Sequence, residues 1–298
     1  MTISAMIRTA AVALLICTNG VFAEDISLFD AVNAGPDVWT WADARLVSKE
    51  GKLVITPSSD KNVPGNVYLE DRFLYSPKGI LNLQVDRLMG GTYTVQVLAF
   101  KGTTFLGSAD VLKESVKTGP LSFPLSGVPI PPGTETISFK IWVSKTAGGG
   151  LVLGSLRYDL PLVAGSALYD KTIDTATTVT TDRAVWTMTD KGGMITLAQG
   201  QQSGCVLLPD RIQKPDAGVL VLQAGDVKNG SLTAQIVAFD ASSNYVGSVD
   251  AAKKMTATLS ARLENIEWPA GTAEFQVKVW LGGTQNPSAV LKRLLIVK

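Results

Sequence analysis

Lysine, glutamine and tryptophan side chains alternate with apolar side chains along several segments of the sequence. In residues 137 to 143, Lys140 and Trp142 alternate with Phe139 and Ile141. Successive side chains of a β-strand point to opposite faces, so we expect Lys140 and Trp142 on the face that does not enter the core. An indole can stack on the apolar face of a pyranose, and amide and ammonium groups form directional hydrogen bonds with hydroxyls. The pattern therefore predicts a sugar-binding face.

The same alternation groups further polar side chains with this pair, and a later part of the chain repeats the set. The candidate ligand-binding residues are Trp142, Lys140, Gln84 and Gln96 and, in the repeat, Trp280, Lys278, Gln223 and Gln235. This grouping assumes that the strands that carry them are neighbours in one sheet. The alternative interpretation is structural: the polar residues cover a solvent-exposed sheet, and the Trp side chains pack under a loop or against the other domain.

An internal duplication underlies this repetition. Residues 67 to 100 align without a gap with residues 206 to 239, and the Lys-x-Trp segments align later in each copy. The front of each copy aligns as residues 28 to 30 with 168 to 170, and as residues 38 to 40 with 185 to 187, which pairs Trp39 with Trp186. Solenoid repeats are typically ~20 to 50 residues long, so a duplication of this length indicates two whole domains.

The elements that must position these side chains are short strands with period-two alternation, separated by turns rich in Gly, Pro, Asn and Ser. Such strands bury one face each, which predicts an all-β fold of two tandem jelly-roll β-sandwich domains. We expect a signal peptide at residues 1–23, a first sandwich at 24–161 and a second at 162–298. The product is then exported from the cytoplasm: it is extracellular, periplasmic or attached to the cell surface. No segment is long enough for an integral membrane span.

Composition excludes several classes of function. The 298 residues contain 27 Lys and Arg, 26 Asp and Glu, and no His. Balanced charge without basic runs predicts no nucleic-acid partner. The absence of His removes the usual general base and the commonest zinc ligand. The only carboxylates kept in both copies are Asp30/Asp170 and Asp71/Asp210, and the sequence has no nucleophile elbow or phosphate loop. We therefore expect a noncatalytic protein without a cofactor.

The order of motifs carries a resemblance. Each copy has an early Phe-Asp or Tyr-Asp, then a Trp, a strand that ends in Ala-Phe, a Gly-Thr turn, a strand that ends in Lys-x-Trp and a last apolar strand. This resembles the jelly-roll carbohydrate-binding modules of exported bacterial proteins, which are similar in shape to galactose-binding-like domains. The resemblance implies sugar binding on the concave sheet or in loops at one end, with Trp142 and Trp280 as stacking residues.

The resemblance also implies a structural calcium ion, which is common in such modules. Asp30 and Asp159 are the candidate calcium ligands of the first copy. The second copy has Val297 where the first has Asp159. The metal-binding residues are therefore unknown.

Other notable residues have a structural interpretation as the first choice. Trp39 and Trp41 form a second candidate site, but an early Trp in a sandwich more often closes the edge of the core. Trp268 belongs to the second copy alone and is expected to cover a loop. Cys205, the only thiol after cleavage of the leader, lies in an apolar segment and is expected to be buried and inert. Arg72 and Arg211 are expected to form structural hydrogen bonds.

Together these observations predict an exported, noncatalytic carbohydrate-binding protein that recognises a glycan or cell-surface polysaccharide through its Trp-bearing sheet faces. Two copies would raise the avidity for a repeating polymer. The alternative is a self-associating structural subunit of a cell envelope, matrix or extracellular filament, since a net charge near zero favours self-association.

Overall fold

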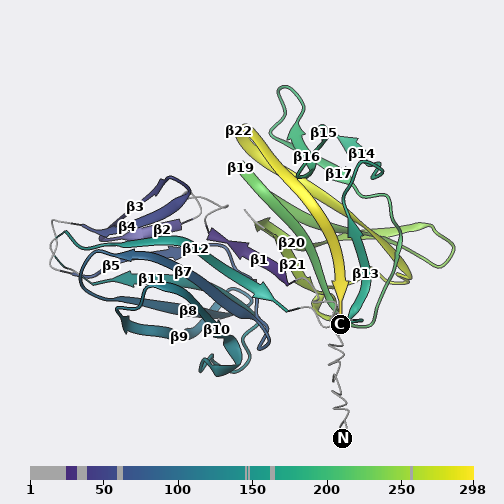
Figure 1. Cartoon of the computed structure of the whole chain (residues 1–298). Helices are drawn as coiled ribbons and strands as arrows, with labels where there is room; N and C mark the ends of the chain where they lie inside the picture. Colours follow the sequence, from purple (N-terminus) through teal and green to yellow (C-terminus); the bar gives the residue numbers. More distant parts are fainter. Residues whose placement is uncertain are drawn as a thin grey trace, which may run out of the picture.

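The alternation of apolar and polar residues produces strands with one buried face, as the sequence predicts. The computed structural model describes residues 25–31, 39–58, 63–144, 146, 148–161, 165–255 and 258–298. The expected signal peptide lies outside these residues. The fold is all-β and consists of two jelly-roll β-sandwiches, shown side by side in Figure 1, the first in purple to teal and the second in green to yellow. The expected fold class is confirmed.

Two six-stranded sheets form the first sandwich. Its elements are β1 (Ile26–Asp30), β2 (Trp39–Ala42), β3 (Ala44–Lys49), β4 (Lys52–Pro57), β5 (Gly65–Leu69), β6 (Phe73–Leu74), β7 (Ile80–Leu88), β8 (Tyr93–Lys101), β9 (Thr104–Ser115), β10 (Gly119–Pro124), the 3₁₀ helix η2 (Leu125–Gly127), β11 (Thr136–Val143) and β12 (Leu151–Leu160). One sheet has the order β10-β7-β12-β4-β3, with β1 paired to β12. The other has the order β2-β5-β11-β8-β9, with β6 paired to β11.

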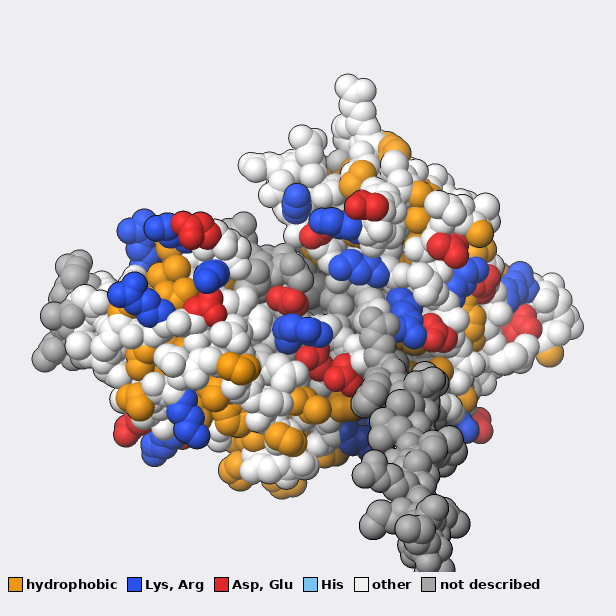
Figure 2. Space-filling model, in the orientation of Figure 1, with side chains coloured by type: hydrophobic (Ala, Val, Ile, Leu, Met, Phe, Trp, Pro, Cys, Tyr) orange, Lys and Arg blue, Asp and Glu red, His pale blue; other side chains and the backbone are white. Residues whose placement is uncertain are grey.

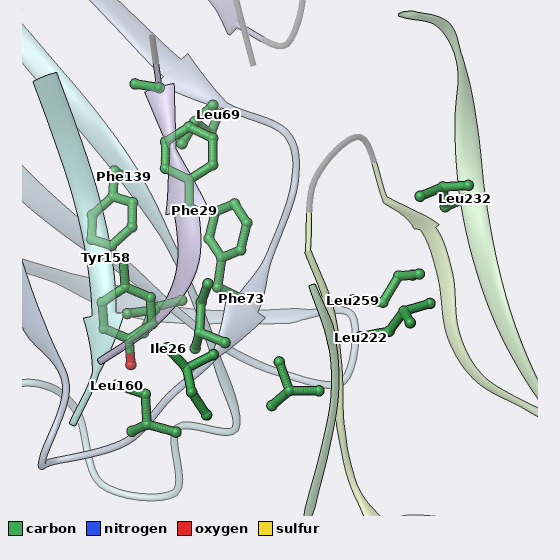
Figure 3. Close-up of a cluster of buried hydrophobic side chains, with 14 of the residues drawn as sticks. Ile26, Phe29, Leu69, Phe73, Phe139, Tyr158, Leu160, Leu222, Leu232 and Leu259 are labelled. Atoms are coloured by element: carbon green, nitrogen blue, oxygen red, sulfur yellow. The ribbon is translucent and has the colours of Figure 1, made fainter. Parts of the chain in front are cut away.

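The core of the first sandwich lies between these sheets. Phe139 and Ile141 of β11 are fully buried, and they face Leu83 of β7 and Tyr158 of β12 across the two layers. Phe139 packs edge-on against Tyr158, with the ring centroids 5.6 Å apart. Figure 3 shows these rings together with Phe29 and other buried side chains. Because the apolar side of β11 faces inward, Lys140 and Trp142 lie on the outer face of the second sheet.

The second sandwich repeats this arrangement with longer strands. Its elements are β13 (Ala167–Thr172), β14 (Thr180–Asp182), β15 (Ala184–Thr189), β16 (Gly192–Leu197), β17 (Ser203–Leu207), β18 (Ile212–Gln213), β19 (Val219–Phe239), β20 (Tyr245–Met255), β21 (Leu259–Arg262), the 3₁₀ helix η3 (Leu263–Asn265) and β22 (Glu274–Val297). The start of β19 pairs with β21 and its end pairs with β20, while β22 pairs with both parts. Strand β19 thus corresponds to β7 and β8, and β22 to β11 and β12. The two layers join into one ten-stranded sheet.

The register of the strands corrects one predicted alignment. Trp39 lies on β2, opposite Leu69 of β5. Trp186 lies on β15, opposite Ile195 of β16, and this hairpin corresponds to β3 and β4 of the first sandwich. The pairing of Trp39 with Trp186 is therefore wrong. The turns before the two hairpins confirm the new alignment, because Asp43 and Arg183 both adopt a left-handed φ, of 53° and 56°.

The two sandwiches meet through residues of β6 and β21. The Arg262 Nη2 atom donates a hydrogen bond to the carbonyl oxygen of Tyr75, at 3.1 Å. A cavity of about 390 Å³ beside this contact is lined by residues of both sandwiches, among them Glu135 and Asp250. Figure 3 shows Leu222 and Leu259 of the second sandwich near the buried cluster of the first. The domain boundary near residue 161 stays a prediction.

Candidate functional site

A chain of hydrogen bonds crosses three strands on the outer face of the first sandwich. The Nε1 atom of Trp142, on β11, donates to the Oε1 atom of Gln96, on β8, at 2.7 Å. The Nε2 atom of Gln96 donates to the Oδ1 atom of Asp110, on β9, at 2.7 Å. The Lys140 Nζ atom lies 4.0 Å from the centroid of the Trp142 ring. We call these four residues the first Trp network. All four are partly exposed.

The second sandwich contains the same arrangement, which we call the second Trp network. Trp280 Nε1 donates to Gln235 Oε1 at 3.3 Å, and Gln235 Nε2 donates to Asp250 Oδ1 at 3.0 Å. Lys278 Nζ lies 5.5 Å from the centroid of the Trp280 ring. The sequence predicts the Trp, Lys and Gln members of both networks on one face, and the structure brings them together. Asp110 and Asp250 are members that the sequence analysis missed.

The networks fix the role that each side chain can play. The carbonyl oxygen of Gln96 accepts from the indole and its amide donates to Asp110, so this glutamine orients the ring and has fewer groups left for a ligand. Burial lowers the pKa of the Lys140 ammonium, because charge is less well solvated there. A partly desolvated cation is stabilised when a ligand supplies oxygen acceptors. The ammonium and the free part of the indole surface are thus the groups available to a sugar.

Two of the predicted site residues lie elsewhere. Gln84 is on β7 of the opposite sheet, where its Nε2 atom donates to Asp86 Oδ1 at 3.0 Å. Gln223 lies in the corresponding part of β19, opposite Arg293 of β22. Their placement with the Trp residues is wrong, because alternation gives the face of a strand and not the sheet to which the strand belongs. In a jelly roll, consecutive strands such as β7 and β8 enter opposite layers.

The other tryptophans pack against the core, as the structural interpretation predicts. Trp39 is 4% exposed and contacts Phe29 edge-on at 6.3 Å between centroids. Trp186 covers Gly193 so closely that a Cβ atom there would come within 2.0 Å of the indole. Trp268 donates from Nε1 to the carbonyl oxygen of Leu263 at 2.9 Å. Trp41, by contrast, is half exposed on the edge strand β2.

Cys205 is buried, as expected, and forms no disulfide within the described part of the chain. Burial raises the pKa of its thiol, which keeps it protonated and unreactive. It lies directly opposite Trp280 on the neighbouring strand β17. The Cys205 side chain therefore lies beside Trp280 on the same face of the sheet.

A second aromatic arrangement, which the sequence analysis missed, lies at the β8–β9 hairpin. The Arg72 guanidinium lies 3.8 Å from the centroid of the Phe100 ring and donates to the carbonyl oxygen of Gly102 at 2.9 Å. Phe105, directly opposite Phe100, has its ring centroid 5.5 Å away and is 56% exposed. Arg72, Phe100 and Phe105 form the first hairpin cluster. The structural role expected for Arg72 is confirmed.

The β19–β20 hairpin of the second sandwich repeats it. Arg211 lies 3.9 Å from the centroid of the Phe239 ring, and its Nη1 atom donates to the carbonyl oxygen of Ser243 at 3.4 Å. Tyr245 lies opposite Phe239 and is 62% exposed. Arg211, Phe239 and Tyr245 form the second hairpin cluster. The sequence contains a signal by which these clusters could have been found, because the Ala-Phe and Asp-Arg pairs align in the two copies.

The carboxylates Asp170 and Asp210 of the second copy accept hydrogen bonds from neighbouring side chains. Hydrogen bonds from Arg293 lower the pKa of Asp170. Burial would raise the pKa of Asp210, but hydrogen bonds from Lys171 and Tyr169 outweigh it and lower the pKa. A general acid of a glycosidase needs a raised pKa, which neither group has.

The candidate calcium ligand Asp159 faces nitrogen donors. Asn82 Nδ2 donates to it at 2.8 Å and Arg157 Nη2 at 3.1 Å. Calcium requires six to eight oxygen ligands, so this setting does not fit the ion. Among the described residues, no group of three or more acidic or Cys side chains could hold a metal. A calcium site stays a prediction from the resemblance.

Comparisons with known proteins give only loose structural matches. No protein-family model and no curated protein matches the sequence. The tandem of modules CBM22-1 and CBM22-2 from Paenibacillus barcinonensis Xyn10C is similar over 92% of this chain and 98% of its own, at 10% identity and a TM-score of 0.31. The xylan-binding module CBM86 from Roseburia intestinalis is similar over 44% of this chain and 96% of its own, at 14% identity and a TM-score of 0.30.

Both of these matched structures are carbohydrate-binding modules. Enzymes share the likeness: allantoicase is similar over 90% of this chain and 93% of its own, at 7% identity and a TM-score of 0.26. These superpositions are loose, and a function has to be argued from the side chains of this chain. Within the described part of the chain, no helix is long and apolar enough to cross a membrane.

Proposed function

We propose that the chain is an exported, noncatalytic protein that binds a polysaccharide through the outer faces that carry the two Trp networks. The observation that supports this most is the repetition of the whole arrangement, from indole to amide to carboxylate with an ammonium over the ring, on corresponding strands of both sandwiches. The residues opposite the Lys and Trp side chains differ between the copies, Tyr68 and Asn66 in the first and Leu207 and Cys205 in the second. The repeated groups are those that suit hydroxyl-rich, partly apolar ligands.

The geometry supports a preorganised contact surface. Gln96 holds the Trp142 ring in a fixed orientation, so less side-chain entropy is lost when a sugar stacks on it. Lys140 supplies a cation for ring or hydroxyl oxygens beside the indole. Two such faces on one chain convert a second binding event into an intramolecular one, which raises the avidity for a repeating polymer.

Charge on the surface fits a neutral polymer. Figure 2 shows Lys and Arg side chains interspersed with Asp and Glu on the face in view, without a large region of one sign. The full chain has a formal net charge of +1 at pH 7. The protein therefore binds through local contacts and not through long-range attraction.

Affinity electrophoresis tests this function directly. The chain from residue 24 is run through gels that contain xylan, mixed-linkage β-glucan, galactomannan, dextran or xanthan. We expect retardation by at least one polymer, and its loss in the variant with both Trp142→Ala and Trp280→Ala. Trp41→Ala, which removes an exposed indole outside the networks, is the matched control and should be retarded like the unchanged chain. Circular dichroism confirms that each variant is folded.

The second candidate function is self-association as a structural subunit. The observation that favours it is the set of exposed aromatic side chains on both sandwiches, Trp41, Phe105 and Tyr245. Light scattering at rising protein concentration distinguishes the two functions. Oligomers that dissociate in the Trp142→Ala/Trp280→Ala variant, with no retardation by any polymer, would favour the structural function over sugar binding.

A further inference from the structure

The two hairpin clusters share an outer face with the Trp networks. Gln96 and Phe100 are both on β8, and their side chains lie on the same face because they are an even number of residues apart. Four residues of a strand span about 13 Å. The register places Trp142 opposite Thr94 and Thr136 opposite Phe100, so the cluster lies further along the same two strands. In the second sandwich, Gln235 and Phe239 of β19 have the same spacing.

The exposed ring of Phe105 is held in place by its surroundings. Arg72 stacks on Phe100 and hydrogen-bonds the carbonyl oxygen of Gly102 in the turn. The backbone N–H of Gly102 donates to Glu135 Oε2 at 2.9 Å, which fixes the turn from its other side. Phe105 then lies on Phe100 with one side toward solvent. An aromatic ring that is already ordered loses little entropy on binding a ligand.

Single exposed apolar residues are common on proteins and need no explanation. Here, however, each sandwich has an aromatic ring at this place of the hairpin that is more than half exposed. In both sandwiches an arginine guanidinium stacks on the phenylalanine opposite the exposed ring. The ring type differs, Phe105 in one and Tyr245 in the other, while the aromatic character is kept. A purely local packing role would not require exposure in both copies.

We propose that Phe105 and Tyr245 are second stacking contacts for the same polysaccharide, so that each sandwich binds an internal run of several neutral sugars along β8 or the end of β19. This inference rests on the proposed sugar binding by the Trp networks. The ligand is then an extended chain and not a terminal sugar, since a single residue cannot reach both rings. The sugars are neutral because the cations on this face are already engaged, Arg72 and Arg211 with a phenyl ring and a turn carbonyl oxygen and Lys140 with the Trp142 ring.

The test compares ligand length between variants of the full mature chain. The polymer that retards the protein is cut into di-, tetra- and hexasaccharides, and their affinities are measured by calorimetry. Because one aromatic stacking contact is lost in each sandwich, we expect Phe105→Ala/Tyr245→Ala to weaken hexasaccharide binding roughly 2- to 12-fold. The disaccharide affinity should not change. Trp142→Ala/Trp280→Ala should weaken binding of every length.

Two further variants control for folding and for exposure. Phe105→Tyr transfers the residue of the second copy to the first and should bind the hexasaccharide like the unchanged chain. Val116→Ala removes an apolar side chain that is 67% exposed away from the cluster and should have no effect.

Three results would overturn the inference. If Phe105→Ala/Tyr245→Ala binds the hexasaccharide with full affinity while Trp142→Ala/Trp280→Ala does not, the second contacts are absent and the proposed function stands. If the unchanged chain binds no polymer, both are wrong. If the unchanged chain forms oligomers that only the Phe105→Ala/Tyr245→Ala variant dissolves, the hairpin clusters are contacts between copies of the chain.

Discussion

The two sandwiches carry the same Trp network on different surroundings. In the first, Tyr68 lies opposite Lys140 and Asn66 lies opposite Trp142. In the second, Leu207 and Cys205 take these places, and the Arg183 guanidinium lies 5.7 Å from the centroid of the Trp280 ring. The comparison shows that the network is kept while its neighbours vary. Asn66 is buried, so the additional group that the first face offers to a sugar is the partly exposed ring of Tyr68.

The Trp–Gln and Lys–Trp distances within the network are both shorter in the first sandwich. The indole-to-amide hydrogen bond is 2.7 Å in the first sandwich and 3.3 Å in the second. The lysine lies 4.0 Å from the ring centroid in the first and 5.5 Å in the second. We therefore expect the first sandwich to be the tighter binding site.

The largest difference in stability between the two sandwiches is expected when a buried ring is removed from one hydrophobic core at a time. Phe139→Ala and Phe275→Ala each remove a fully buried ring, which costs about 3–5 kcal/mol of unfolding free energy. Calorimetry of each variant should show the loss in the transition of the altered sandwich. Equal shifts of the whole unfolding profile in both variants would instead show that the sandwiches unfold as one unit.

Substitution of one glutamine in each sheet tests which sheet carries the binding face. Gln96→Ala removes the partner that orients Trp142, so we expect roughly a 10-fold loss of affinity for the polymer in the first sandwich, measured in the Trp280→Ala background. Gln84→Ala is the matched control on the opposite sheet, and its affinity should be unchanged. An equal loss in both variants would contradict the placement of the site.

These glutamines also show what the sequence could predict. Alternation placed Lys140 and Trp142 outside the core, and the duplication identified Gln96 and Gln235 as their partners. Neither pattern could show that Gln84 and Gln96 belong to different sheets, because strand order is decided by contacts between distant parts of the chain. Trp39 and Trp186 were aligned by residue type, although the register relates Trp186 to the neighbouring hairpin. Phe105 and Tyr245 become recognisable only when the arginine beneath each neighbouring ring is seen.

The first strands of the sandwiches provide a smaller test. Tyr169 of β13 corresponds to Phe29 of β1, and its hydroxyl donates to Asp210, which also pairs with Lys171 at 2.7 Å. Tyr169→Phe, which copies the first sandwich, removes one hydrogen bond and should cost about 1 kcal/mol. Urea denaturation measures it. No change in the midpoint would show that the hydroxyl contributes no net stability.

An ion pair gives the second sandwich a distinct response to acid. Arg293, at the position of Ser155 in the first sandwich, hydrogen-bonds Asp170 at 2.7 Å and lowers its pKa. A folded-state pKa below the unfolded value, about 3.9, means that this stability is present above that pH and is lost as the pH falls through the folded-state pKa.

Asp170→Asn should therefore weaken the second sandwich at pH 7 by less than about 1 kcal/mol, because the pair is partly exposed. It should also reduce the loss of stability between pH 5 and pH 2, followed by urea denaturation at several pH values. A variant with the full acid response of the unchanged chain would assign that response to other groups.

In the second sandwich, strands β19 and β22 run through both layers, which affects how the sheet unfolds locally. Where β19 and β22 turn from one layer to the other, their backbones pair across two breaks in register, with Lys228 opposite Ser288 and Gly230 opposite Gly283. The first sandwich has a loop at residues 89–92 between β7 and β8. Amide hydrogens at the crossing of the second sandwich should exchange with solvent only when a larger part of the sheet opens. Because single strands run through both layers of the second sandwich, we expect its two layers to move together.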